Sequence, residues 1–265
     1  MQDYWLRQTP AVPLFDDILW SRPEHRASAG KLLIIGGNGM GFACVGEAYT
    51  SANRAGAGVI HALMPDVLRK TVGKVFAGAS FAPSTPSGSL AMIALSDLLS
   101  HSAWADGVLL AGDLGRNSET SALLESYVQK YQGLLAVTKD AVDYFYMTPE
   151  LLCQREHTVL VLSMAQLQRL GTALKFTTPF LLSMGMLLLA QALHEFTNLY
   201  PVTIVTKELD NLVVAHKGRI SSTRLTEDKD IWRVSTTAAA ATFWMQNPGR
   251  PFEAVTTAIY DTTKG

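Results

Sequence analysis

The chain has 265 residues, of which 48% are apolar and 17% charged; this composition is typical of a globular protein and excludes a disordered one. Its formal net charge is −1 and it has no long basic block, which argues against a protein that binds nucleic acid or an anionic membrane. The N-terminal segment lacks a signal-peptide core, and the most apolar stretch, residues 180–193, is too short to span a bilayer, so we expect a cytoplasmic protein in which this stretch is a buried helix.

Short apolar runs alternate with segments of helical periodicity along the chain. In chain order we expect a strand at 32–35, a helix at 45–55, a strand at 59–63, a loop at 81–89, a helix at 90–100, a strand at 108–111 and a helix at 118–131. There follow strands at 134–137 and 158–162, a short helix from 166, a helix at 179–195, strands at 202–206, 212–215 and near Ile220, and a helix at 236–246. This alternation predicts an α/β fold with a mostly parallel sheet. We interpret residues 1–265 as one domain, on which residues 1–25 pack as an extension.

Five loops follow predicted strands, and in a parallel sheet such loops meet at the edge where ligands bind. They span residues 36–43, 112–117, 138–141, 163–166 and 207–211. The first lies in KLLIIGGNGMGFA, whose glycines let backbone amides approach a ligand. Its spacing does not match the Gly-x-Gly-x-x-Gly dinucleotide pattern, and an ordinary tight turn is an equally good interpretation.

The other loops carry polar side chains that fit either a ligand site or a structural role. Asp113 could bind a ligand hydroxyl or cap the helix after it, and Asp140 has the same two possibilities. Lys207 could contact a phosphate or be an ordinary surface lysine. We expect Cys44 and Cys153 to be buried structural thiols, and because the six histidines lack metal-ligand spacing we expect no metal site.

Several of these segments resemble, in the same order, those of the ADP/ATP-dependent NAD(P)H-hydrate dehydratases. They are GKLLIIGGNGMGFA with the later RAGAG, LLAGDLGR, AVTKDAVDYF, a strand ending near Ser163, IVTKELDNLVVAHKG and NPGRPFEAV. The resemblance implies a ribokinase-like fold, with three α/β/α layers around a mostly parallel sheet. It also implies repair of hydrated NADH or NADPH with ATP or ADP, accompanied by Mg²⁺, in a homo-oligomer.

The resemblance further implies a role for residues in each loop. On the substrate side these residues are Gly36, Gly37, Asn38, Ala43, Asp113, Gly115, Asp140 and Ser163. On the nucleotide side they are Lys207, Asn211, Ser235, Thr236 and Thr237, the last three as alternatives for the cap of the last predicted helix.

The chain departs from this family at the positions that would carry the chemistry. Ser163 stands where the family has a His, Glu208 replaces the Gly of Lys-Gly-x-x-Thr, and two glycines of the Gly-Pro-Gly-Leu-Gly loop are absent. The Gly-Ser-Gly-Asp segment, which would supply an anion hole and the catalytic base, is replaced by KDIWRVSTTAAAATFW. Asp230 is the candidate for a substitute base, and losing a general base typically costs about 10²–10⁴ in rate.

Three functional hypotheses follow from these matches and departures. We favour a divergent relative that has lost the ancestral base and anion hole and binds a nucleotide or related metabolite. The first alternative is an active dehydratase that uses substitute residues. The second is a kinase of small hydroxylated metabolites, which would need the same base and anion hole. Asp230 facing the first glycine loop would favour an enzyme, whereas Trp232 or Arg233 filling the phosphate cleft would count against one.

Overall fold

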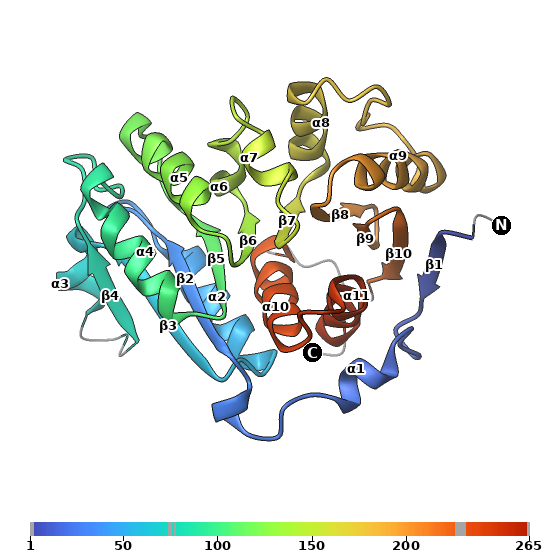
Figure 1. Cartoon of the computed structure of the whole chain (residues 1–265), viewed down its shortest axis with the longest axis horizontal. Helices are drawn as coiled ribbons and strands as arrows, with labels where there is room; N and C mark the ends of the chain where they lie inside the picture. The colour runs from blue at the N-terminus through green and yellow to red at the C-terminus, as the bar shows by residue number, and fades with distance from the viewer. Residues whose placement is uncertain (1–2, 74–75, 77, 226–231, 264–265) are drawn as a thin grey trace.

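The computed structural model describes residues 3–73, 76, 78–225 and 232–263, and within these ranges the strands form one ten-stranded sheet (Figure 1). The strands are β1 (Trp5–Gln8), β2 (Lys31–Gly36), β3 (Val59–Pro65), β4 (Ala79–Ala82), β5 (Gly107–Gly112), β6 (Leu134–Thr138), β7 (Thr158–Leu162), β8 (Thr203–Glu208), β9 (Asn211–His216) and β10 (Arg219–Arg224). Their order is β1-β10-β9-β8-β7-β6-β5-β2-β3-β4. Neighbours from β8 to β4 pair in parallel, and only the pairs that include β9 are antiparallel among the described strands. The predicted mostly parallel sheet is confirmed.

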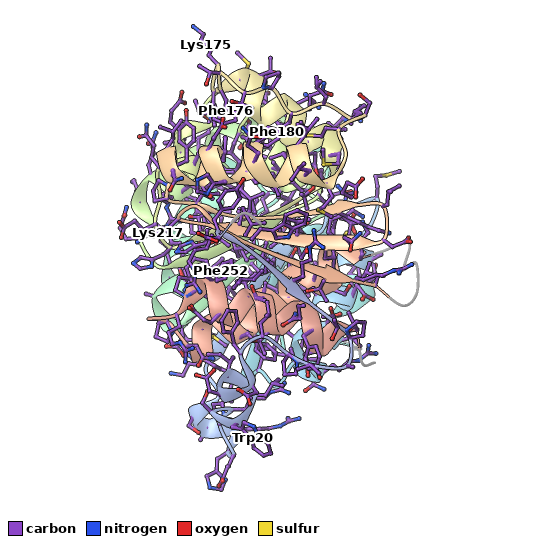
Figure 2. The ribbon with its side chains drawn as sticks, turned by 90° about the vertical axis from the view of Figure 1, so that its right-hand side faces the viewer. Trp20, Lys175, Phe176, Phe180, Lys217 and Phe252 are labelled. Atoms are coloured by element: carbon purple, nitrogen blue, oxygen red, sulfur yellow. The ribbon has the colours of Figure 1, made fainter. Side chains whose placement is uncertain are left out.

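Helices cover both faces of this sheet. They are α1 (Asp16–Trp20), α2 (Ala43–Arg54), α3 (Arg69–Val72), α4 (Leu95–Trp104), α5 (Ser118–Lys130), α6 (Asp140–Asp143), α7 (Glu150–Cys153), α8 (Met164–Ala173), α9 (Met186–Leu199), α10 (Trp232–Gln246) and α11 (Pro251–Thr262). The short 3₁₀ helices are Arg26–Ser28, Asp66–Leu68 and Met92–Ala94. Figure 2 shows Phe180 on one side of the sheet and Phe252 on the other, as expected for three layers.

The central strands are apolar along their whole length because both of their faces are buried. In β2, Leu33 and Ile35 join a core with α4 to α9, while the alternate Leu32 and Ile34 join a core with α2, α10 and α11. This alternation is the two-residue period of a strand. It explains why short apolar runs in the sequence located these strands.

The predicted helix at 179–195 is wrong over its first seven residues. Helix α9 begins only at Met186, after an extended Gly185. Phe180 instead packs in the loop against Phe176 and Phe196, at ring-centroid distances of 5.5 and 5.6 Å. Leu182 is 64% exposed, so the stretch 180–193 is not one buried helix.

The elements that were not predicted are the strands β1 and β4, the helix α11 and the short helices α1, α3, α6 and α7. Strand β1 pairs in parallel with β10, and the buried Gln8 side chain donates to Thr223 Oγ1 at 2.9 Å and to the Thr256 carbonyl at 3.0 Å. Helix α11 begins at Pro251, where a proline is well tolerated because the first helical turn needs no amide donor. No helix in the described ranges is both long and apolar enough to cross a membrane.

Candidate ligand-binding site

The predicted loops lie together at the carboxyl edge of the sheet. They follow β2, β5, β6 and β7, which are neighbours, and the next strand is β8. Helix α10 runs opposite to these strands: Arg233 in its first described turn bonds Gln166 beyond β7, whereas Gln246 at its other end bonds the carbonyls of Ala29 and Gly56 before β2 and β3. The start of α10 therefore also lies at the carboxyl edge.

The first glycine loop is shaped by the close approach of β2 to β5. A Cβ added to Gly36 would lie 2.7 Å from the Gly112 carbonyl oxygen, so a side chain has no room there. Gly37 has φ +85° and donates its amide to the same carbonyl at 3.1 Å. Asn38 accepts the Met40 amide at 2.7 Å, and Ala43 is exposed at the start of α2.

Asp113 and Asp140 join three of the loops to one another. The Asp140 carboxylate accepts the backbone amides of Asp113 at 2.8 Å and Leu114 at 2.9 Å, and Asp113 accepts the Cys44 amide at 2.8 Å. Asn38 donates its side-chain amide to the Asp113 carbonyl at 2.5 Å. These carboxylates brace the loop backbone.

Neither aspartate caps the helix after it. Asn117 caps α5, accepting the amides of Glu119 and Thr120, while the Asp113 carboxylate accepts the Cys44 amide in the first turn of α2. Helix α6 has no side-chain cap, because the Asp140 carboxylate faces the loop after β5. The capping role expected as one possibility for each residue is therefore wrong.

The surroundings of Asp113 and Asp140 also shift the pKa of nearby groups. Burial raises the pKa of Asp140, although its hydrogen bonds from Leu114 and Asp113 oppose the shift. Burial raises the pKa of the Cys44 thiol to about 11, and the Asp113 carboxylate adds to this. Cys44 is thus a protonated, buried thiol at neutral pH rather than a nucleophile. Cys153 is also buried, as expected.

Gly115 and Ser163 have conformational roles in their loops. Gly115 has φ +81°, and a Cβ there would lie 2.5 Å from Ser89 Oγ. Ser163 caps α8: its hydroxyl accepts the Gln166 amide at 3.2 Å, and the Gln166 side chain accepts the Ser163 amide at 3.3 Å. The Ser163 hydroxyl therefore begins a helix, a role the sequence analysis had not considered.

The predicted nucleotide-side residues are divided between two places. Lys207 and Asn211 are partly buried on the β8–β9 hairpin, where Asn211 lies opposite Glu208. The predicted caps Ser235, Thr236 and Thr237 are wrong, because α10 already includes Trp232 and these residues lie inside it. The hydroxyls of Ser235 and Thr237 donate to carbonyls one turn earlier, and Thr236 is buried. Asp230 lies outside the described residues.

Arg233 was considered from the sequence only as a side chain filling the phosphate cleft, and the polar contacts that link β7 to α10 were not predicted. Arg233 Nη1 donates to Gln166 Oε1 at 2.8 Å. Gln166, which is 8% exposed, donates its amide to the Lys139 carbonyl at 2.7 Å and to Asp143 Oδ1 at 2.9 Å. The only available signal was the Ser-x-x-Gln spacing, which marks a helix start. In the described part of the chain, no three His, Cys, Asp or Glu side chains are grouped as metal ligands.

No family model and no curated protein matches the sequence, but solved structures do. A ribokinase-like superfamily protein from Enterococcus faecalis V583 has a TM-score of 0.74 at 16% identity, over 99% of this chain and 88% of that one. The ADP/ATP-dependent NAD(P)H-hydrate dehydratase from Bacillus subtilis, co-crystallized with ATP/Mg²⁺, has a TM-score of 0.61 at 15% identity, over 94% and 86%. The Staphylococcus aureus pyridoxal kinase, in complex with AMP-PCP and pyridoxal, has a TM-score of 0.56 at 10% identity, over 86% and 85%. At these identities the similarity shows the fold, and this chain has the ribokinase-like fold.

Proposed function

We propose that this chain binds a nucleotide or related metabolite at the carboxyl edge of its sheet and has lost the dehydratase reaction. Its fold supports the interpretation that the chain is a relative of the ribokinase-like kinases and dehydratases. Fold alone does not assign an activity, so the proposal depends on the site. Two parts of the site support its two halves.

The loop network supports the binding half of the proposal. Hydrogen bonds of Asp113 and Asp140 within the chain hold the loops after β2, β5 and β6 to one another. Gly36 leaves room for the close approach of the Gly112 carbonyl, and Gly37 and Gly115 adopt positive φ angles that favour glycine. A site fixed in advance loses less conformational entropy when a ligand binds.

The first described turn of α10 supports the loss of the dehydratase reaction, and this observation carries the proposal. Elimination in the related enzymes needs a carboxylate base beside an anion hole at this helix start. Here the described part of α10 begins with Trp232 and Arg233, its first turn from Trp232 onward contains no acidic residue, and Arg233 is bonded to Gln166. A guanidinium cannot act as a general base, because it stays protonated in proteins.

Two measurements test the two halves. We expect ATP, ADP or AMP to raise the melting temperature, and we expect no reappearance of NADPH absorbance when hydrated NADPH is incubated with the protein and ATP or ADP. Turnover would contradict the second half, and Asp230→Asn would then show whether Asp230 is the substitute base. Absence of any nucleotide-induced shift would contradict the first half.

A matched pair of variants places the binding at this edge of the sheet. Asp140→Asn should remove most of the nucleotide-induced shift, because it breaks the brace between the loops after β5 and β6. Asp106→Asn is the control, since Asp106 also accepts a backbone amide, that of Lys31 at 2.8 Å, at the start of β2 on the opposite edge of the sheet. Equal effects of both variants would place the nucleotide elsewhere.

A further inference from the structure

A group of polar side chains at the carboxyl ends of β6 and β7 takes no part in the network of Asp113 and Asp140. Tyr146 follows α6, Gln166 and Arg169 belong to α8, and Arg233 belongs to the first described turn of α10. We call these four residues the Arg–Tyr cluster. Segments far apart in the sequence thus bring two guanidinium groups and a phenol together.

The Tyr146 hydroxyl is the most unusual atom of the cluster. It is buried and forms no hydrogen bond of acceptable geometry with any described residue. The guanidinium of Arg169 stacks on the Tyr146 ring, with Cζ 4.0 Å from its centroid. A buried hydroxyl without a partner costs stability and calls for an explanation, such as an acceptor supplied from outside the chain.

The charges around this hydroxyl keep it a donor. Burial raises the pKa of Tyr146, and the Asp143 carboxylate raises it further by its charge and as a nearby acceptor, although their contact lacks the geometry of a hydrogen bond; the charges of Arg169 and Arg233 only partly oppose this. The phenol therefore retains its proton at neutral pH. A ligand group placed against this hydroxyl would have to offer an acceptor oxygen.

Arg233 has further donors that the described protein does not use. Of the five N–H donors of a guanidinium, one is bonded to Gln166 Oε1, and no described carboxylate forms an ion pair with Arg233 or Arg169. The adjacent Asp143 is instead bonded to Gln166 Nε2. Among the described residues, two guanidinium charges thus face one nearby carboxylate, and within this part of the chain the cluster has both a positive excess and spare donors.

We propose that the Arg–Tyr cluster binds the phosphate end of the ligand, with Arg233 and Tyr146 donating to its oxygens and Arg169 adding charge. This assignment rests on the proposed nucleotide binding and names the chemical group recognised. A phosphate offers several acceptor oxygens and negative charge, and guanidinium groups pair with it in bidentate fashion. An uncharged sugar would satisfy the hydroxyl but leave the positive excess unbalanced.

Calorimetric titration with ADP, inorganic pyrophosphate and adenosine at 0.15 M salt tests this assignment. We expect Arg233→Met and Tyr146→Phe each to weaken ADP and pyrophosphate binding at least tenfold, as lost charge-assisted hydrogen bonds do. Adenosine, which has no phosphate, should bind both variants as it binds the wild type. Arg26→Met is the control, because it removes the same charge from the opposite edge of the sheet, where Arg26 bonds Asn53.

The outcomes separate the two proposals. Unchanged ADP binding in both variants would overturn the phosphate assignment and leave nucleotide binding intact. Loss of pyrophosphate binding without loss of ADP binding would also overturn it. No binding of ADP or pyrophosphate by the wild type would overturn both proposals. The melting temperature of Tyr146→Phe should equal or exceed that of the wild type, and a large drop would mean that the hydroxyl bonds Asp143 and serves stability.

Discussion

Two ends of the same sheet edge satisfy their polar groups in opposite ways. In the loops after β2, β5 and β6, Asp113 and Asp140 accept backbone amides and the Tyr144 hydroxyl donates to the Gly115 carbonyl at 2.6 Å. At the end formed by β7 and α10, the Tyr146 hydroxyl has no partner among the described residues and Arg233 has spare donors. A region whose polar groups satisfy one another fixes shape, whereas a region with spare donors is suited to a ligand.

The largest expected loss of stability comes from disturbing the region that fixes shape, the loops after β2, β5 and β6. Gly112 has φ +102°, and an added Cβ would lie 2.7 Å from Asp140 Oδ1. Gly112→Ala should lower the free energy of unfolding by about 4 kcal/mol, since an unfavourable backbone angle and a packing clash add. Urea unfolding would measure it.

The matched control for this variant is Gly41→Ala. Gly41 belongs to the first glycine loop, but an added Cβ meets no atom within 4 Å and its φ is not in the left-handed range. Its unfolding midpoint should change little. Similar losses of stability in the two variants would show that the contact with Asp140 is not what makes Gly112→Ala destabilising.

The opposite edge of the sheet holds a buried histidine that makes the stability of the protein depend on pH. His216 is 6% exposed and bonds Thr203 Oγ1 at 2.9 Å, and burial lowers its pKa from 6.5 to about 4. Between these two values the unfolded chain binds a proton that the folded chain does not. Stability should therefore fall as pH drops from 6.5 to 4, by about 3 kcal/mol in all. Urea unfolding at pH 7, 5.5 and 4.5 measures this loss.

His216→Gln keeps a polar side chain at this position but does not titrate. We expect its stability to vary less with pH over the same range, even if it is lower at pH 7. A pH dependence identical to that of the wild type would assign the acid sensitivity to other groups. The urea titrations that compare the two carboxyl-edge regions would then have to be made at a different pH.

The sequence located the frame of the molecule better than the chemistry at its edge. Buried parallel strands are continuous apolar runs, so β2, β5, β6 and β7 were found. Asp113 and Asp140 were selected correctly as loop residues that meet, but their roles depend on backbone amides of other loops, which no local pattern encodes. The predicted helix cap at residues 235–237 was wrong because α10 includes residues from Trp232 onward.

The Arg–Tyr cluster could not be predicted at all. Its members come from separate segments, and nothing in the spacing of Tyr146, Gln166 and Arg233 links them. Only the arrangement of β6, β7 and α10 makes them neighbours. Short elements were lost in the same way: β4 has four residues, too few to show a period.

The smallest expected effect gives the sharpest comparison of the two ends, because it uses the same atom change in both. Tyr144→Phe removes a hydroxyl that donates to Gly115, and it should lower the free energy of unfolding by about 1 kcal/mol. Tyr146→Phe removes a buried hydroxyl without a described partner, so stability should equal that of the wild type or rise by about 1 kcal/mol. Parallel urea titrations without nucleotide measure both. If Tyr146→Phe were the more destabilising variant, the wild-type Tyr146 hydroxyl would be a stabilising group of the fold. The distinction between a region that fixes shape and a region with spare donors would then fail at the residue on which it most depends.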